Sequence, residues 1–162
     1  MLVASGADVH ATNKRGRTAL HHAVQCHNNP FTNYDIIKFL VSKEADLNAK
    51  GDDGITPLLL AMSPHSSVYK NSDIIKFFVS KGSDVNVQGY HGGTPLHYVA
   101  CWPSHCYSMP GYVETAEFLI SKGADVNAKD WEGKTPLDRA EERGNSVMAE
   151  YISKHVFKVP HQ

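Results

Sequence analysis

Two short motifs recur along the chain at one spacing, and this repetition limits the possible folds more than any other feature of the sequence. The first begins with threonine and occupies residues 18–21 (TALH), 56–59 (TPLL), 94–97 (TPLH) and 135–138 (TPLD). The second contains an aspartate and occupies residues 7–10 (ADVH), 45–48 (ADLN), 83–86 (SDVN) and 124–127 (ADVN). By subtraction, both motifs step by 38, 38 and 41 residues. Two independent motifs with one rhythm predict stacked copies of a single structural unit.

Each unit has the pattern of two helices joined by a loop. The threonine can cap free N–H groups at a helix start, and the proline that usually follows is suited to the first helical position. A short helix is therefore expected, for example over residues 95–101. A second helix is predicted by apolar positions shared between residues 36–41 and 74–79, with Lys38 and Lys76 in one exposed slot. Asn33 and Asn71 are the expected caps of this second helix.

A glycine follows the second helix in most units, where a left-handed residue commonly closes the last turn. Gly6, Gly82 and Gly123 occupy this position, and Glu44 replaces the glycine in one unit. If the backbone at Glu44 is left-handed, the side chain costs on the order of 1 kcal/mol.

Polar turns connect the units at residues 13–16 (NKRG), 51–54 (GDDG), 89–92 (GYHG) and 130–133 (DWEG). Each ends in glycine two residues before the threonine motif, and the flanking residues are expected to extend as a short β-hairpin.

These motifs resemble the ankyrin-repeat family, whose signature T-P-L-H-x-A lies in a unit of about 33 residues. Residues 18–23 (TALHHA) and 94–99 (TPLHYV) follow the signature with one change each, whereas Leu59 and Asp138 replace the histidine in the other two units. Residues 120–135 (ISKGADVNAKDWEGKT) carry the most characteristic stretch. The resemblance covers nearly the whole chain. It implies an all-α ankyrin-repeat solenoid of helix–loop–helix units with short β-hairpin connections and lengthened inter-helix loops.

The repeat spacing predicts a single ankyrin-repeat domain over residues 1–154. It would contain a truncated repeat (1–12), three full repeats with inter-helix insertions of 5, 5 and 8 residues (13–50, 51–88 and 89–129) and a C-terminal repeat (130–154), followed by a tail (155–162). Loops accept such insertions at little entropic cost. Because an end repeat normally needs a polar outer face, either residues upstream of Met1 continue the array or Leu20 and its neighbours are partly exposed. The charged last repeat is expected to act as a cap.

The charge balance argues against nucleic-acid and anionic-membrane partners. Sixteen lysines and arginines oppose 17 aspartates and glutamates, for a formal net charge of −1. The apolar stretches are far shorter than the roughly 18 residues that span a bilayer. Three cysteines at no disulfide-framework spacing, and the absence of an apolar signal core, predict an intracellular protein, cytoplasmic or nuclear.

A zinc site is one alternative, because His97 and Cys101 share a predicted helix face and His105 and Cys106 follow closely. The ankyrin resemblance instead implies that His97 forms hydrogen bonds within and between repeats, and Pro103 ends the helix before the second pair. No feature brings a nucleophile, a base and a stabilising group together, and no phosphate-binding loop is present. We therefore expect no enzyme activity, no metal and no cofactor.

Protein binding is the function that the resemblance implies, through a concave surface made by the hairpin tips and the first helices. Aromatic residues are enriched in interface hot spots, and basic and acidic tips could orient a partner. The predicted contact residues are Lys14, Arg15, Asp52, Asp53, Tyr90, His91, Tyr98, Trp131 and Glu132, with Arg17, His22, Leu60 and Arg139 beside them. The expected protein is a non-catalytic scaffold for a protein partner of unknown identity, as a monomer or as part of a longer array.

Several alternatives stay open at the level of sequence. The tips could be solvated turns, with Trp131 packed on its own hairpin. The chain could be a structural spacer of a longer array with no partner of its own. The long loop over residues 102–111 (WPSHCYSMPG) could form a second contact surface, although we expect Trp102 and Tyr107 to cover the ends of neighbouring helices.

Overall fold

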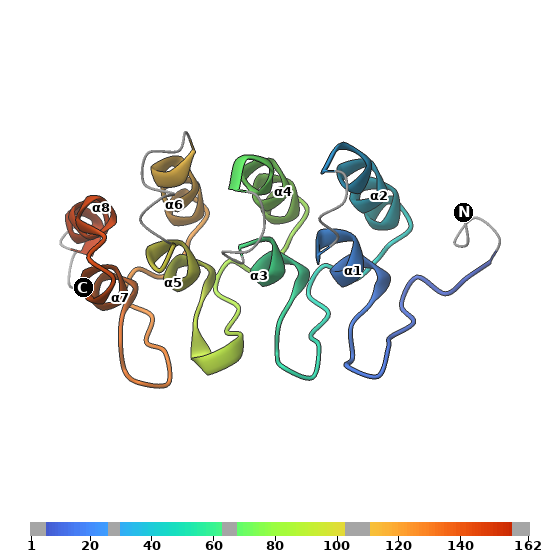
Figure 1. Cartoon of the computed structure of the whole chain (residues 1–162), viewed down its shortest axis with the longest axis horizontal. Coiled ribbons are helices and arrows are strands. Elements are labelled where there is room, and N and C mark those ends of the chain that lie inside the picture. The colour runs from blue at the N-terminus through green and yellow to red at the C-terminus, as the bar shows by residue number, and fades with distance from the viewer. Residues whose placement is uncertain (1–5, 26–29, 63–67, 103–110, 157–162) are drawn as a thin grey trace.

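The computed structural model describes residues 6–25, 30–62, 68–102 and 111–156 of the 162-residue chain (Figure 1). These residues contain eight α-helices: α1 (Ala19–Gln25), α2 (Pro30–Ser42), α3 (Pro57–Ala61), α4 (Val68–Ser80), α5 (Pro95–Ala100), α6 (Tyr112–Ser121), α7 (Pro136–Glu142) and α8 (Ser146–Val156). A short 3₁₀ turn, η2 (Tyr90–Gly92), precedes α5. The predicted all-α repeat architecture is confirmed.

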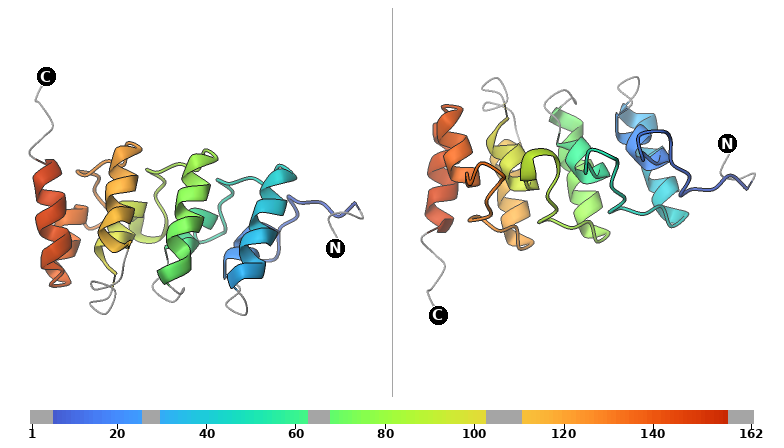
Figure 2. Two further views of the ribbon diagram at one scale, coloured as in Figure 1. Left: turned by 90° about the horizontal axis from the view of Figure 1, so that it is seen from above. Right: turned by 90° about the horizontal axis from the view of Figure 1, so that it is seen from below.

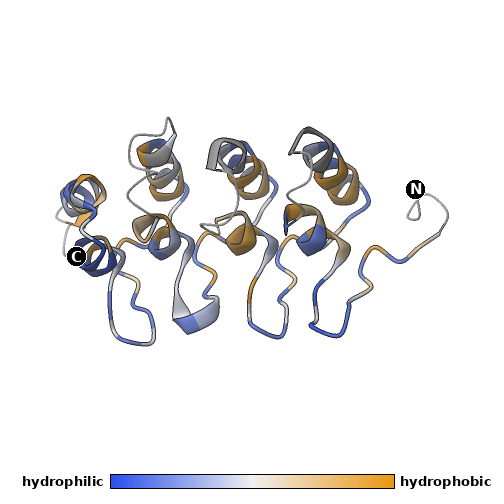
Figure 3. Cartoon of the chain, viewed as in Figure 1, coloured by the Kyte–Doolittle hydropathy of each residue, from blue (hydrophilic) through white to orange (hydrophobic). Residues whose placement is uncertain are grey.

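The helices form two layers along one axis (Figures 1 and 2). The inner layer contains α1, α3, α5 and α7, and the outer layer contains α2, α4, α6 and α8. The connecting turns project from the inner layer on the side away from the outer helices. Apolar faces of the two layers meet each other and the next repeat (Figure 3). Each repeat thus contributes to one continuous core.

The threonine motifs start the inner helices as predicted. Thr56 accepts a hydrogen bond from the Leu59 backbone N–H at 3.4 Å, and Pro57 takes the first helical position. Thr135 and Asp138 form a reciprocal capping box, in which each side chain accepts from the backbone N–H of the other. These local bonds satisfy N–H groups that a helix start leaves free.

The predicted caps of the outer helices are wrong. Helices α2 and α4 begin at Pro30 and Val68, so Asn33 and Asn71 lie inside them. Both helices have 13 residues, against 10 in α6, so part of each five-residue insertion lengthens a helix. Pro30 was the available signal for the start of α2, because proline is favoured at the first helical position.

The expected β-hairpins are also not formed in the described residues. The only extended pairing there is an isolated bridge between Thr12 and Thr18. Each turn closes instead through two backbone hydrogen bonds of its own, such as Gly51 N–H to Ile55 O at 3.0 Å and Gly54 N–H to Gly51 O at 2.8 Å. Each turn closes between residues four positions apart, such as Gly51 and Ile55, and this leaves no extended segment within the turn for a β-ladder.

The left-handed position after the second helix is confirmed. The φ angles of Gly6, Gly82 and Gly123 are 90°, 101° and 90°, and that of Glu44 is 64°. Glu44 therefore holds a conformation that its Cβ disfavours.

The first full repeat buries Leu20, so the alternative in which this residue is partly exposed is wrong. Leu20 is completely buried, and so are the equivalent Leu58 and Leu96, whereas Leu137 in the last repeat is only half-buried. This leucine faces the following repeat, so its burial depends on the C-terminal neighbour. At the N-terminal end of the stack, the residue with an exposed apolar side chain is Ile36 on α2, whose exposed fraction is 45%.

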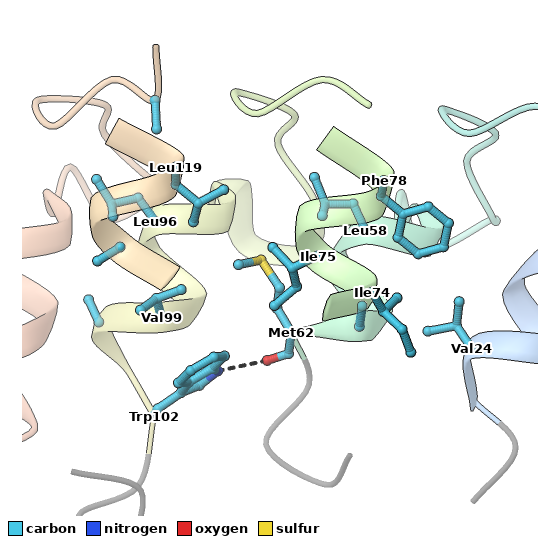
Figure 4. Packing of buried hydrophobic residues seen from close by; sticks show 14 of the residues in the cluster. Val24, Leu58, Met62, Ile74, Ile75, Phe78, Leu96, Val99, Trp102 and Leu119 are labelled. Carbon is cyan, nitrogen blue, oxygen red and sulfur yellow. Dashed lines mark hydrogen bonds between the residues drawn. The ribbon is translucent and has the colours of Figure 1, made fainter. Parts of the chain in front are cut away.

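Trp102 packs at the C-terminal end of α3 in the preceding repeat, as predicted. The indole is 4% exposed, and its Nε1–H donates to the Met62 carbonyl of the preceding repeat at 2.9 Å (Figure 4). Tyr107 lies outside the described residues.

At the C-terminal end of the domain, α8 continues to Val156, two residues beyond the expected end. None of the helices described is long and apolar enough to cross a membrane.

Candidate protein-binding surface

Four turns carry most of the predicted contact residues, and we call them tip 1 (residues 13–16), tip 2 (51–54), tip 3 (89–92) and tip 4 (130–133). Neighbouring tips are joined by backbone hydrogen bonds: Asp52 N–H donates to Arg15 O, and Trp131 N–H donates to His91 O, both at 3.0 Å. Tips 1 and 2, and tips 3 and 4, are therefore joined as two pairs.

Tips 3 and 4 form an aromatic cluster. The rings of Tyr90 and His91 lie 3.9 Å apart, and the rings of His91 and Trp131 lie 6.0 Å apart, edge to face. Tyr90 is 58% exposed and Trp131 is 72% exposed. Trp131 thus lies against the preceding tip, which corrects the alternative that it packs on its own hairpin. Two large aromatic surfaces face solvent side by side.

Gly92 makes room for the indole. A Cβ on Gly92 would lie 2.4 Å from Trp131 Cδ1, and the φ angle of Gly92 is +75°. His91, just before it, has φ 57° and ψ 19°, a left-handed conformation that costs a residue with a side chain on the order of 1 kcal/mol. Tip 3 is therefore bent into an uncommon shape that positions the aromatic cluster.

An open groove of about 350 Å³ lies between the cluster and helices α5 and α7. Tyr98 of α5 and Cys101, the residue after α5, line it together with Tyr90, His91 and Glu132 of the tips. Burial raises the pKa of Tyr98 and of Cys101, so both side chains hold their protons at neutral pH. A protonated thiol is a poor nucleophile. The groove offers contact area and hydroxyl hydrogen bonding rather than reactive chemistry.

The far wall of the groove is a charge network centred on Arg139. Its guanidinium contacts Asp130 at 2.7 Å, Glu132 at 3.0 Å and Glu142 at 2.9 Å. The other oxygen of Asp130 accepts from the backbone N–H groups of Glu132 and Lys134 at 2.9 and 3.0 Å. These bonds fix the shape of tip 4 and attach it to α7.

The network also sets the protonation of its members. Burial disfavours the charged form of Asp130, but the backbone N–H of Lys134 and the Arg139 guanidinium offset this, and the pKa of Asp130 lies below its ordinary value. The hydrogen bond to Asp130 raises the pKa of Arg139. At neutral pH the carboxylate and the guanidinium are therefore both ionised, and the wall is held by charge-assisted hydrogen bonds.

His97 supports the groove from behind, in the structural role that the ankyrin resemblance implied. Its Nδ1 accepts from the Thr94 backbone N–H at 3.2 Å, so the proton lies on Nε2, which donates to Lys134 O at 3.0 Å. His21 makes the equivalent bonds to Thr18 and Ile55. Desolvation lowers the pKa of both histidines. Each joins its helix start to the next repeat in neutral form.

The second repeat replaces this histidine by Leu59, which is buried against Gly89. A Cβ on Gly89 would lie 2.5 Å from Leu59 Cδ1 and 3.3 Å from the Tyr98 hydroxyl. Apolar packing replaces a hydrogen bond here, and glycine at the start of tip 3 provides the space. The glycines of tip 3 and the large side chains around it thus depend on each other.

The structure brings together only part of the predicted contact set. Tyr90, His91, Tyr98 and Glu132 share the groove, and Trp131 adjoins it through His91. Lys14, Arg15, Asp52 and Asp53 are exposed on tips 1 and 2, away from the groove. Arg17, beside tip 1, is held by Asp53 at 2.7 Å and by Gln25 at 3.0 Å.

Five groove residues lie outside the predicted contact set: Gly93, His97, Cys101, Asp130 and Arg143. Cys101 was considered only as a metal ligand. Arg143 follows Arg139 at the i,i+4 spacing of one helix face, and that spacing was the available signal. Asp130 gave no signal, because its importance depends on Arg139 of the following helix.

The zinc alternative finds no support from His97, because both ring nitrogens are used in hydrogen bonds. His105 and Cys106 lie outside the described residues. Within the described ranges, no three His, Cys, Asp or Glu side chains lie close enough to hold a metal ion.

The family model for ankyrin repeats (3 copies) matches residues 1–89, 32–130 and 65–160. The chain belongs to the ankyrin-repeat family. No curated protein matches it significantly. Ankyrin repeats are generally protein–protein interaction modules and are typically not enzymes. The exposed aromatic cluster and the groove beside it therefore lie in a repeat domain whose family suits a protein partner.

Proposed function

We propose that this ankyrin-repeat chain is a non-catalytic scaffold that binds a partner protein through its tips and the adjoining face of the inner helices. The observation that supports this most is the aromatic cluster, in which Tyr90 and Trp131 remain 58% and 72% exposed beside an open groove. Contiguous exposed aromatic surface is unusual in a monomer and marks interaction sites. Tyrosine and tryptophan are also the residues most enriched in binding hot spots.

The cluster is rigid before a partner arrives. Trp131 lies on Gly92, its backbone bonds to His91, and Arg139 holds the rest of tip 4. A surface that is already ordered loses little conformational entropy on association. The binding free energy of the aromatic contacts is then available for affinity.

Charge on the tips provides a direction for the partner. Tip 1 carries Lys14 and Arg15, whereas tip 2 carries Asp52 and Asp53. A partner that crosses the tips meets a basic end first and an acidic, aromatic end afterwards. Such complementarity mainly sets orientation and association rate.

Capture of partners from a cell extract tests this proposal. The combined variant Tyr90→Ala, Tyr98→Ala and Trp131→Ala is compared with a control, Ile36→Ala and Val147→Ala, which truncates the two exposed apolar residues of α2 and α8. We expect the first variant to lose proteins that the unchanged chain and the control retain. Undiminished capture of every protein by the first variant would refute the proposal, provided that its circular dichroism shows an intact fold.

The second candidate is a structural spacer within a longer repeat array, and one observation favours it. Ile36 on α2 is 45% exposed, whereas Ile74 and Thr115, at the same position of α4 and α6, are 7% and 1% exposed. The residue at this position is thus buried in the two repeats that follow another full repeat and exposed in the first. Fusion of a designed ankyrin repeat before residue 6 tests this candidate, because a fitting neighbour should raise the melting temperature. An unchanged melting temperature would count against it.

The cysteine usage supports one further part of the proposal, the location, to which we add an expectation about the oligomeric state. We place the protein inside the cell, and we expect the domain alone to be a monomer. Cell fractionation and size-exclusion chromatography test these two statements.

A further inference from the structure

We infer that the partner segment recognised by tips 2, 3 and 4 presents arginine side chains to the aromatic cluster. This inference rests on the proposed function and adds the chemistry of the partner. It follows from two features of the same surface: exposed aromatic faces, and carboxylates placed on both sides of them.

The charges of the tips are divided sharply. Tip 1 contains Lys14 and Arg15 and no acidic residue. Tips 2, 3 and 4 contain no lysine or arginine but four acidic residues, namely Asp52, Asp53, Asp130 and Glu132. The aromatic cluster of tips 3 and 4 therefore has acidic residues of tip 2 before it and of tip 4 beside it.

Three cations near this surface are already engaged in ion pairs. Arg17 pairs with Asp53, Arg139 pairs with three carboxylates, and Lys134 pairs with Glu142 at 2.8 Å. Arg143 lies at the far wall of the groove, beside Cys101. The surface around the cluster thus keeps carboxylate oxygen atoms that a partner could use.

Two of these carboxylates remain open to a partner. Asp52 is exposed and makes no ion pair among the described residues. Glu132 is bound to Arg139 by one oxygen at 3.0 Å, and its side chain is 64% exposed. Exposed pairs of this kind are weak, so a partner cation can share the carboxylate.

A guanidinium matches this arrangement better than other side chains. It stacks on the faces of tryptophan and tyrosine, and its planar fork binds a carboxylate through two hydrogen bonds. A lysine ammonium would gain the charge but not the stacking or the fork. A neutral apolar side chain would cover the rings, but it would displace water from the carboxylates without giving them a new hydrogen-bond donor.

The test uses a short glycine- and serine-based peptide that carries two arginines, measured by nuclear magnetic resonance. The two tryptophans give two indole N–H signals, and Trp102 is an internal reference because its indole is buried and bonded to Met62. The control peptides carry citrulline, which keeps the shape but not the charge, or lysine. We expect the arginine peptide to shift the Trp131 signal alone and to bind about tenfold more tightly than the citrulline peptide, with lysine between them.

Variants of the protein locate the contact. Trp131→Ala, and Asp52→Asn combined with Glu132→Gln, should each weaken the arginine peptide several-fold. The control Asp73→Asn removes an exposed carboxylate from the outer helix α4 and should change nothing. Equal affinity for arginine and citrulline peptides, a response outside tips 2 to 4, or no response up to about 10 mM peptide would overturn the inference.

This result can be separated from a failure of the proposed function. Suppose that capture of extract proteins depends on Tyr90, Tyr98 and Trp131, but arginine and citrulline peptides bind equally well. The proposed binding surface would then stand, and only the inferred preference for arginine would be refuted. If the triple variant instead captured every extract protein that the unchanged chain captures, the proposed binding surface itself would be refuted.

Discussion

Replacing Glu44 by glycine should stabilise this protein, although the change removes a side chain from the repeat stack. Glu44 has φ 64°, and its counterparts Gly6, Gly82 and Gly123 have φ between 90° and 101°. The Glu44 side chain is exposed and has no ion pair or hydrogen bond among the described residues. The substitution therefore relieves backbone strain without removing a described polar contact.

Two opposing contributions set the magnitude. A left-handed residue with a Cβ costs about 1–2 kcal/mol, which glycine avoids. Glycine also gives the unfolded chain more freedom, which costs about 0.4–1 kcal/mol of stability. The difference is a gain of about 0.5–1 kcal/mol, which corresponds to a rise in melting temperature of about 2–3 °C for a domain of this size.

Thermal unfolding followed by circular dichroism measures this effect, and two controls isolate its cause. Glu44→Ala keeps the Cβ but removes the carboxylate, so it should leave the melting temperature almost unchanged. Gly82→Ala should lower the melting temperature by a similar amount, because a Cβ there meets no atom within 4 Å and only the backbone angle is affected. If Glu44→Gly failed to raise the melting temperature while Gly82→Ala lowered it, the account of strain at Glu44 would be wrong.

Three further predictions concern the inner layer and the tips. Desolvation lowers the pKa of His21 and His97 in the folded protein, so the unfolded chain binds protons at these histidines first as the pH falls. The free energy of unfolding should therefore decrease below about pH 6.5, by at most about 1.4 kcal/mol per pH unit for each histidine. Urea unfolding at several pH values checks this, and His21→Leu, which copies the second repeat, should reduce the slope; equal slopes would contradict it. Asp130→Asn should lower the free energy of unfolding by about 2 kcal/mol, because Arg139 loses its most buried partner, and urea unfolding should show a cost well above that of any exposed carboxylate. Gly92→Ala should destabilise the protein and change the fluorescence of the indole above it, whereas Gly133→Ala has the same φ of +75° but no atom within 4 Å and should cost only the backbone strain. Equal costs for the two glycine variants would show that the indole contact has no energetic weight.

The repeating architecture was accessible from the sequence because its signals are local. Thr135, its proline and Asp138 form a capping box within four residues, and the left-handed residue at Glu44 was placed by comparison with three glycines at the same position. Such motifs recur with the repeat period and need no knowledge of distant contacts. The aromatic residues Tyr90 and Trp131 were likewise found from their place on the tips.

Other features could not be obtained this way, for identifiable reasons. The starts of α2 and α4 depend on how the inserted residues divide between loop and helix, and Asn33 and Asn71 were misplaced as caps. The hairpin prediction was wrong because the two backbone hydrogen bonds that close each turn lie within the turn and do not continue into a ladder in the described residues. Local preference favoured both predictions, but the lengths of the connections decided against them.

The sequence by itself determined that this chain is an ankyrin-repeat solenoid and which residues occupy its tips, because capping, turn and repeat signals act over a few neighbouring residues. Only the tertiary structure decided that Trp131 lies on Gly92, that Asp130 and Arg139 form one wall and that Leu59 packs beside Gly89. These contacts join residues of different repeats or different helices, and their geometry follows from how the units stack. The proposed binding surface results from this stacking, whereas the fold follows from the repeated unit.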